Sequence, residues 1–286
     1  MRHTPVLAHE VVEGLNLAPG KHLIDGTLGD AGHAEEILRR IAPSGKLLGI
    51  DADPESLVRA QHFLAGERER VIFVRGSFQH LETIVREHSF GPVHGILLDL
   101  GWSMPQFKER GRGFSFMTDE PLDMRYDPNS GQTAAELVNE MDAEELTRIL
   151  RFYGEEKRAH ALAEAIIAAR PVARTVDIVR AVEKVYSARR GKIHPATQTF
   201  QALRIATNGE LDVLATVLPQ AVRVLAKGGR LAVITFHSLE DRIVKQFFRK
   251  EAELTIITKK PVRPSREEVK ANPAARSAKL RIAEKI

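Results

Sequence analysis

Short apolar runs separated by amphipathic segments recur along the first hundred residues, and this alternation restricts the folds open to the chain. Between the runs, segments 33–42 and 54–66 place apolar residues at helical spacing, and Pro54 suits a first helical turn. Strands that alternate with helices build right-handed βαβ units and a parallel sheet. The apolar runs that predict strands occupy 21–29, 45–53, 70–78 and 94–103.

The alternation stops after the fourth strand. Between about 105 and 210 the sequence gives no convincing strand, and its helical patterns carry expected N-caps at Asp142, with Glu145 three residues on, and at Thr175. Strand–helix order then resumes with a helix over 210–229, closed by Gly228 and Gly229. A fifth strand is expected at 230–238, and two more, at 254–258 and 279–284, would form an antiparallel edge of a seven-stranded sheet.

The sequence therefore predicts an α/β protein with a Rossmann-like sheet and an inserted helical domain. The sheet domain is discontinuous and takes 1–105 and 211–286, and the insert takes 106–210. Ligands of open parallel sheets bind beyond the carboxyl ends of the strands, so the expected ligand site follows the first four strands.

The loop after the first strand has the spacing G-x-x-G-x-x-G rather than the G-x-G-x-x-G of dinucleotide enzymes, and Asp25 precedes it. An acid there disfavours a pyrophosphate and suits a ligand with an ammonium group, such as S-adenosylmethionine. Asp51 ends the second strand, where a carboxylate can accept both ribose hydroxyls. Phe78 can pack against adenine, although a core role fits it equally well on local grounds.

Asp99 ends the fourth strand in ILLDLGWS, and with Ser103 it can hold a target amine with its lone pair towards a sulfonium methyl group. Methyl transfer of this kind gains mostly from proximity and needs no metal. The stretch FHSLEDR suggests a hydrolase through His237 and Ser238, but it lacks the G-x-S-x-G elbow. A polar lip near the substrate, or a helix N-cap at Ser238, fits it better.

Positive charge is concentrated in two segments. Residues 259–286 carry nine Lys and Arg against three Glu, a net of +6, so the other residues sum to −2 within the total of +4. Segment 186–204 carries no acid, and such patches suit a polyphosphate ligand, although a solvated surface explains either one alone about as well. Its cations are Arg189, Arg190, Lys192 and Arg204.

Long blocks of this sequence resemble the RsmH (MraW) family, the small-subunit ribosomal RNA cytosine-N4 methyltransferases of bacteria. The resemblance runs nearly end to end. It is carried by HTPVLAHE (3–10), DGTLGDAGH (25–33), GIDADP (49–54), ILLDLGWS (96–103), RGFSF (112–116), PLDMR (121–125), YGEE (153–156), HPATQTFQALRI (194–205), GGRLAVITFHSLEDRIVK (228–245) and NPAARSAKLR (272–281).

The resemblance implies a class I S-adenosylmethionine methyltransferase whose substrate is one cytidine near the decoding centre of 16S rRNA, presented in the small ribosomal subunit. It implies that the insert recognises the substrate, with the HPATQTFQALRI block gripping the RNA backbone. It also implies cofactor contacts at Ala31, Gly32, His33, Asp51, Phe78, Asp99 and Gln106.

Three positions depart from the family pattern. Ala31 stands where glycine is usual, a change expected to be mild, and Trp102 and Met104 replace a small β-branched residue and a serine near the presumed target pocket. His33 could accept a proton, although its place at a helix start favours a role in organising the loop.

Several classes are disfavoured. The eleven histidines show no metal-binding spacing and there is no cysteine, so no metal is expected. No signal peptide and no membrane span are evident, which favours a soluble cytoplasmic protein. Two alternatives remain open: a nicotinamide-dependent oxidoreductase, and a non-catalytic RNA-binding or ribosome-assembly factor.

Overall fold

The structure is a computed structural model and describes residues 5–101, 111–186 and 194–286. The chain forms two compact units, one from residues 1–101 with 211–286 (unit 1) and one from residues 102–210 (unit 2). The boundaries expected from the sequence are 105/106 and 210/211, whereas the units divide at 101/102 and 210/211.

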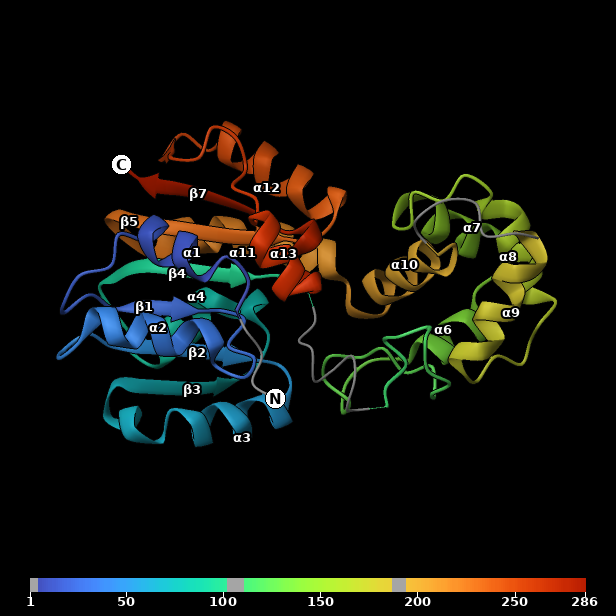
Figure 1. Cartoon of the computed structure of the whole chain (residues 1–286), viewed down its shortest axis with the longest axis horizontal. Coiled ribbons are helices and arrows are strands. Elements are labelled where there is room, and N and C mark those ends of the chain that lie inside the picture. Colours follow the sequence, from blue (N-terminus) through green and yellow to red (C-terminus); the bar gives the residue numbers. More distant parts are fainter. Residues whose placement is uncertain (1–4, 102–110, 187–193) are drawn as a thin grey trace. The chain divides into compact units, whose positions relative to one another are not determined.

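Unit 1 is built on a seven-stranded sheet with helices on both faces (Figure 1). The strand order is β3-β2-β1-β4-β5-β7-β6, with β1 to β5 parallel and β7 antiparallel to both β5 and β6. The strands are β1 (Leu23–Asp25), β2 (Leu47–Asp51), β3 (Val71–Arg75), β4 (Val93–Asp99), β5 (Leu225–Thr235), β6 (Leu254–Ile256) and β7 (Lys279–Lys285).

Two apolar layers hold the helices to the sheet. On one face, α2 buries Ala34, Ile37, Leu38 and Ile41, which recur at helical spacing, against the same cluster that takes up α1 and α3. On the other face, α4, α11 and α12 pack in a second cluster. The helical elements of this unit are α1 (Ala8–Gly14), α2 (Gly32–Ile41), α3 (Pro54–Phe63), η1 (Ala65–Arg70), η2 (Phe78–His80), α4 (Leu81–Glu87), α11 (Glu210–Val224), α12 (Ser238–Lys250), α13 (Arg266–Ala271) and η3 (Pro273–Ser277).

The expected helix over 210–229 is too long. Helix α11 ends at Val224, and β5 begins at Leu225, which already pairs with Val93 of β4. A side chain at Gly229 would come within 2.8 Å of the Ala226 carbonyl oxygen and 3.1 Å of that of Val93. This glycine therefore allows a close approach within an irregular strand pair and does not cap the helix.

In the described part of unit 2, a stretch without helices over 111–133 precedes five helices, and one apolar cluster lies at the centre of the unit. Asp142 caps α7 as predicted: its carboxylate accepts from the Glu145 N–H at 2.8 Å, and the Glu145 carboxylate accepts from the Asp142 N–H. The cap predicted at Thr175 is wrong by one residue, because Thr175 is the first residue of α9 and Arg174 precedes it. The helices are α6 (Ala134–Glu140), α7 (Ala143–Phe152), α8 (Ala159–Ile167), α9 (Thr175–Val185) and α10 (Ala196–Asn208).

Candidate active site at the carboxyl ends of the strands

Three aspartates end three neighbouring strands of the sheet. Asp25 is the last residue of β1, Asp51 of β2 and Asp99 of β4, and β1 lies between the other two. Because these strands are parallel, the three carboxylates fall at one edge of the sheet, where ligands of such folds bind. The sequence alone predicts this grouping.

The loop that follows β1 is held between its two neighbours. The Gly29 N–H donates to Asp51 Oδ2 at 2.7 Å on one side. On the other side, the Thr27 hydroxyl accepts from the Asp99 N–H at 2.7 Å, while the Thr27 N–H donates to Asp25 Oδ1 at 3.1 Å. A side chain at Gly26 would lie 2.6 Å from Leu98 Cδ2, so any other residue here would have to displace that buried leucine side chain.

Ala31 precedes α2 in the left-handed conformation, with φ 64° and ψ 27°. A residue with a Cβ atom loses roughly 1–2 kcal/mol there, whereas glycine does not. The alanine at this position therefore introduces backbone strain directly beside the proposed cofactor loop, a cost that the sequence does not reveal. Its methyl group is fully buried in the apolar cluster under α2.

His33 contacts the end of β4 through its side chain. Its Nε2 lies 3.3 Å from Asp99 Oδ2, and the His33 side chain is 7% exposed. Burial lowers the pKa of His33, but the hydrogen bond and charge of Asp99, together with the charges of Asp25 and Glu268, raise it above its usual value overall. The sequence favours a role of His33 in organising the loop. The structure adds a role for its imidazole, which lies beside the negative charge of Asp99.

Asp25 is buried, with 1% of its surface exposed. Burial raises the pKa of its carboxyl group to about 6. His33 and Thr27 lower this pKa in part, and the charge of Asp99 adds to the rise. A buried carboxyl group that ionises near neutral pH is typical of a functional site.

Asp51 and Phe78 flank the same loop. Asp51 Oδ1 accepts from the Asp53 N–H at 2.8 Å while Oδ2 accepts from the Gly29 N–H at 2.7 Å, so this carboxylate is held in place at the end of β2. Phe78 begins η2 and is partly buried, with its Cβ 3.4 Å from the position that a Cβ on Gly26 would take. Both of the roles considered for Phe78 fit this position.

Some predicted residues lie outside the described part of the chain. They are Ser103 and Gln106 in the expected site, the family departures Trp102 and Met104, and the basic residues Arg189, Arg190 and Lys192.

The stretch FHSLEDR forms the start of α12. The N-cap is His237, one residue before the Ser238 that the sequence suggests, and the Glu240 carboxylate accepts from the backbone N–H groups of Phe236 at 2.8 Å and His237 at 3.2 Å. His237 Nε2 lies 3.1 Å from Glu240 Oε1, and both side chains are buried. Residues 237 and 240 therefore organise a helix end, and no hydrolytic triad is needed to explain them.

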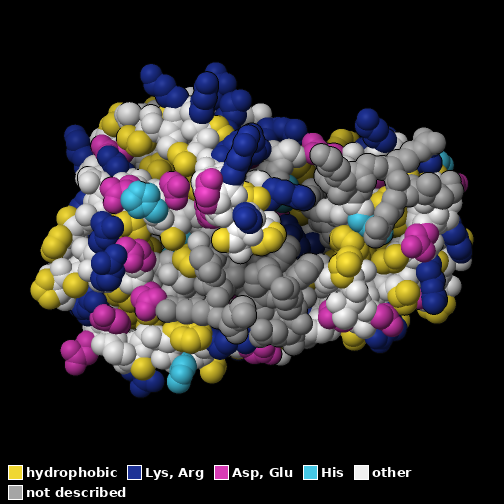
Figure 2. Space-filling model, in the orientation of Figure 1, with side chains coloured by type: hydrophobic (Ala, Val, Ile, Leu, Met, Phe, Trp, Pro, Cys, Tyr) yellow, Lys and Arg dark blue, Asp and Glu magenta, His cyan; other side chains and the backbone are white. Residues whose placement is uncertain are grey.

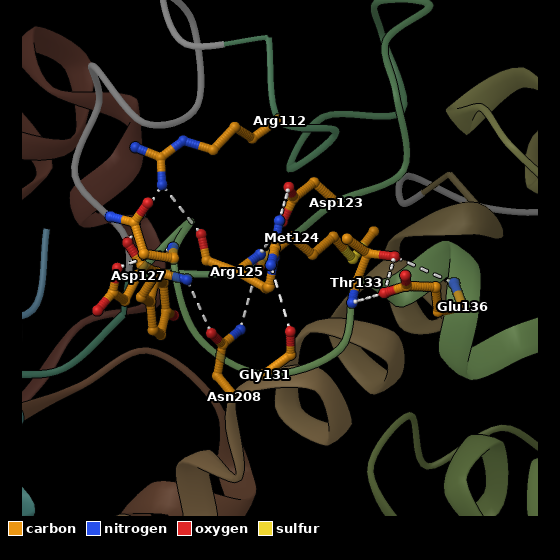
Figure 3. A network of polar contacts seen from close by, with 11 residues as sticks. Arg112, Asp123, Met124, Arg125, Asp127, Gly131, Thr133, Glu136 and Asn208 are labelled. Carbon is orange, nitrogen blue, oxygen red and sulfur yellow. Dashed lines mark hydrogen bonds and ion pairs between the residues drawn. The ribbon is translucent and has the colours of Figure 1, made fainter.

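Two family blocks of unit 2 meet in a polar network (Figure 3). The Arg112 guanidinium donates to the carbonyl oxygens of Arg125 and Tyr126, both at 3.1 Å, and Asn208 of α10 donates to the Met124 carbonyl at 2.8 Å. Arg125 binds Asp123 through two hydrogen bonds, at 2.8 and 2.7 Å.

Burial raises the pKa of Asp123, but the hydrogen bonds and charge of Arg125 bring it below its usual value. The network fixes a long segment without regular structure. Sequence reasoning sees only a loop there, because these contacts join residues far apart in the chain.

Arg204 does not contribute a free charge to the basic segment. Its guanidinium binds Glu210 through two hydrogen bonds, at 2.8 and 2.9 Å, and both side chains are largely buried. Nearby in the same unit, Tyr186 donates to buried Glu156, and burial together with that carboxylate raises the pKa of Tyr186 to about 12. Both pairs are structural, so they weaken the case for a phosphate-binding patch over 186–204.

A glycine-rich loop follows β1, and acids end β1, β2 and β4 of a sheet whose last strands are antiparallel. This arrangement is typical of a class I S-adenosylmethionine-dependent methyltransferase. The sequence profile of the MraW methylase family matches residues 1–286, and the chain belongs to that family.

Relatives that carry the name ribosomal RNA small subunit methyltransferase H occur in several bacteria. The one from Thermomicrobium roseum is 47% identical, over 99% of this chain and 94% of the relative. The one from Coxiella burnetii (strain Dugway 5J108-111) is 46% identical, over 99% of each chain.

Solved structures share the fold at low identity. A protein assigned as an rRNA methylase in Clostridium thermocellum matches with a TM-score of 0.50 and 11% identity over 100% of each chain. The protein PH0851 matches with a TM-score of 0.52 and 11% identity, over 100% of this chain and 47% of the other.

The family assignment answers one alternative left open by the sequence: the chain is a methylase and not a nicotinamide-dependent oxidoreductase. Within the described residues, none of the helices is both long enough and apolar enough to cross a membrane.

Proposed function

We propose that this protein transfers a methyl group from S-adenosylmethionine to the N4 amino group of one cytidine in 16S rRNA, near the decoding centre of the small ribosomal subunit. The relatives at 46–47% identity carry the name of a small-subunit ribosomal RNA methyltransferase. The cytosine-N4 specificity comes from the family resemblance. The observation that carries the proposal is the arrangement of Asp99 at the end of β4.

Asp99 has one carboxylate oxygen in use and one available. Its Oδ2 lies 3.3 Å from His33 Nε2, whereas its Oδ1 is buried and has no hydrogen-bond partner among the described residues. A buried acceptor without a donor costs free energy, on the order of 1–3 kcal/mol. An exocyclic amine supplies the missing N–H donor, and the hydrogen bond would direct the nitrogen lone pair away from Asp99.

The residues present fit S-adenosylmethionine. Asp51 ends β2, where a carboxylate can accept ribose hydroxyls, and Phe78 lies where an adenine ring can pack beside the loop. Ala31, Gly32 and His33 form the turn into α2; the Ala31 N–H donates to the Leu28 carbonyl at 2.9 Å, and the first N–H groups of a helix can bind a ligand. When bound, the cofactor supplies an electrophilic methyl group on a positively charged sulfur, and Asp25 and Asp99 supply negative charge at the strand ends. In our proposal Gln106 also contacts the cofactor, and Ser103 assists Asp99.

The amine must lose one proton overall when it gains a methyl group. In our proposal Asp99 Oδ1 holds the amine and takes up that proton before it passes to solvent, and the His33–Asp99 pair keeps the carboxylate oriented. Positioning of this type supplies most of the rate gain in a displacement that needs no strong nucleophile.

Unit 2 is proposed to recognise the RNA around the target base. It stands in the chain between β4 and β5, two strands whose carboxyl ends border the site. Its polar network around Arg112 and Asp123 gives a long loop one fixed conformation (Figure 3), which suits a recognition surface. We also propose that the protein is cytoplasmic, since its proposed substrate is ribosomal RNA.

The test is transfer of a radiolabelled methyl group from S-adenosylmethionine to small subunits that lack this modification, followed by nucleoside analysis. We expect label in N4-methylcytidine with the unaltered protein. Asp99→Asn is expected to lower turnover by at least a hundredfold while cofactor binding is partly retained, since the amide keeps the size of the side chain but loses its charge.

Glu82→Gln is the matched control. This substitution also removes one carboxylate charge, but Glu82 pairs with Arg223 on the exposed surface. Label in another nucleoside would refute the N4 assignment. Near-normal turnover of Asp99→Asn would refute the role given to Asp99.

A further inference from the structure

Unit 1 has a cavity that lies outside the strand-end site. It has a volume of about 340 Å³ and opens between the second half of α12 and strands β6 and β7. Its floor is apolar: Phe248 is 3% exposed and packs in the core, and Ile256 is partly buried beside it. Such a floor can take a flat ring or a sugar face.

Three cations on the rim of this cavity have no ion pair within the described part of the chain. Lys245 and Arg249 stand four residues apart on α12, which places them on one side of the helix, and Lys259 follows β6. All three are exposed, and no acidic residue lines the cavity. Lys and Arg side chains gather over the part of the surface where α12 and the C-terminal strands lie (Figure 2).

A fourth cation is buried and fixed. Arg281 of β7 is 7% exposed, and its Nε donates to Asp241 Oδ1 at 2.7 Å. Asp241 also binds Lys279 at 3.1 Å, and although burial raises its pKa, its hydrogen bonds to both cations lower that pKa below the usual value. One carboxylate therefore serves two cations, and the guanidinium that lines the cavity is held in place before any ligand arrives.

The cavity lies at the same level of the sheet as the strand-end site. Asp99 pairs with Ile234 of β5, and the preceding residue, Val233, pairs with Arg281 of β7. Neighbouring strands are about 4.8 Å apart, so β7 lies roughly 10 Å and β6 roughly 14 Å from β4 along the sheet. A chain molecule that places one unit at Asp99 can place a neighbouring unit in this cavity.

We propose that this cavity binds a nucleotide of the substrate RNA other than the target cytidine, with its phosphate on Lys245, Arg249 and Lys259 and its base or ribose on the apolar floor. The inference rests on the proposed function, since it takes the substrate to be RNA. An RNA phosphodiester fits the rim because unpaired cations without a lining acid favour a polyanion, and the net charge of +6 over 259–286 extends that preference around the cavity.

The ordinary structural role of Arg281 is to join β7 to α12 through Asp241. That role accounts for Arg281 and Lys279, but it does not account for three further cations around the same cavity. Arg281 is therefore left unchanged in the test, so that buried Asp241 keeps its partner.

The test compares two triple variants. Lys245→Gln, Arg249→Gln and Lys259→Gln together remove the rim charges. Lys46→Gln, Arg68→Gln and Arg86→Gln together form the control, because they remove three exposed cations elsewhere on unit 1. For each protein, affinity for a single-stranded 16S rRNA fragment is measured between 50 and 200 mM salt, and methyl transfer to small subunits that lack the modification is measured over a range of subunit concentrations up to saturation.

We expect the rim variant to bind the fragment about tenfold more weakly. The slope of log affinity against log salt should fall by roughly 0.7, since the proposal places one phosphate on these three cations and each phosphate contact to a single strand contributes about 0.7. Its KM for RNA rises while kcat and cofactor affinity stay unchanged, and the control behaves as the unaltered protein. A 4-thiouridine crosslink from the fragment to the peptide around 245–259 is expected in addition.

A salt slope equal to that of the control, with normal methyl transfer by all three proteins, would overturn this inference alone. No methyl transfer by the unaltered protein would overturn the proposed function instead. Saturable binding of cytidine monophosphate that is lost in the rim variant, with RNA binding unchanged, would make the cavity a site for free nucleotides and would also overturn the inference.

Discussion

Replacing Asp25 with asparagine should stabilise the protein at alkaline pH, against the usual expectation for a buried polar residue. Burial raises the pKa of Asp25 from 3.8 to about 6, so the folded state holds this proton more tightly than the unfolded state does. Stability therefore falls as pH rises from about 4 to about 6, and above that range the full cost is present. A difference of about 2 pKa units corresponds to roughly 3 kcal/mol.

Asparagine avoids this cost, because its Oδ1 can still accept from the Thr27 N–H while its amide stays neutral. Its new NH₂ group needs an acceptor, which removes about 1 kcal/mol of the gain. At pH 8 we expect the free energy of unfolding to rise by about 2 kcal/mol, which corresponds to an increase in Tm of roughly 4 °C or more.

The assay is thermal unfolding of both proteins from pH 4 to pH 8 without cofactor, together with S-adenosylmethionine affinity over the same range. The gain in stability should shrink as pH falls and become a small loss near pH 4, where Asp25 is protonated in the folded unaltered protein and the cost of the new NH₂ group in the variant, about 1 kcal/mol, dominates. Cofactor affinity should rise through about pH 6 in the unaltered protein and stay flat and weaker in the variant. A lower Tm of the variant at pH 8, or a difference that does not change with pH, would refute the reasoning.

Three further predictions address the neighbouring residues and the insert. His33→Gln should lower stability most below pH 6.5, with the loss shrinking as pH rises through the raised pKa of His33; pH-resolved unfolding checks this, and a constant difference would contradict it. Ala31→Gly should change the free energy of unfolding by less than about 1 kcal/mol in urea titrations, because relief of roughly 1–2 kcal/mol of strain is offset by a lost buried methyl group (about 0.8) and by a freer unfolded chain (about 0.4–1). Asp142→Ala should cost about 1 kcal/mol through the lost cap of α7, without altering cofactor affinity, and a calorimetric scan with a cofactor titration measures both.

The sheet could be predicted from the sequence because each strand carries its own signal. The apolar runs within 21–29 and 94–103 are followed by Asp25 and Asp99, and the parallel arrangement of the strands then places those acids at one edge of the sheet. The end of α11 could not be predicted in this way. Gly228 and Gly229 have the composition of a helix stop, and only the pairing of Leu225 with Val93 shows that the strand has already begun.

The grouping of the strand-end acids was predictable from the sequence, but the contacts and pKa shifts around them were not. The strand-end acids follow from the motif spacing, whereas the 3.3 Å contact between His33 and Asp99 depends on how α2 packs on the sheet. Likewise, the left-handed backbone at Ala31 has no signal in an alanine, since a glycine there would have pointed to it. The bond between Arg204 and Glu210 was also hidden, because a basic segment without acids gains its partner from just beyond its end.

The direction in which burial and neighbours move the pKa of a carboxyl group separates the scaffold of this protein from its site. Asp123 and Asp241 are both partly buried, and in each case arginine hydrogen bonds bring the pKa below its usual value, so their ionised forms stabilise the fold. Asp25 is more deeply buried, faces a histidine instead of an arginine, and has a raised pKa, so its ionised form destabilises the free protein. A residue that costs stability needs a gain elsewhere to be explained, and a ligand with positive charge at the strand ends supplies it. The same reasoning applies to Ala31, whose left-handed backbone also costs free energy. The buried charge of Asp25 and the backbone strain of Ala31 therefore lie at the two ends of one loop, beside the proposed cofactor.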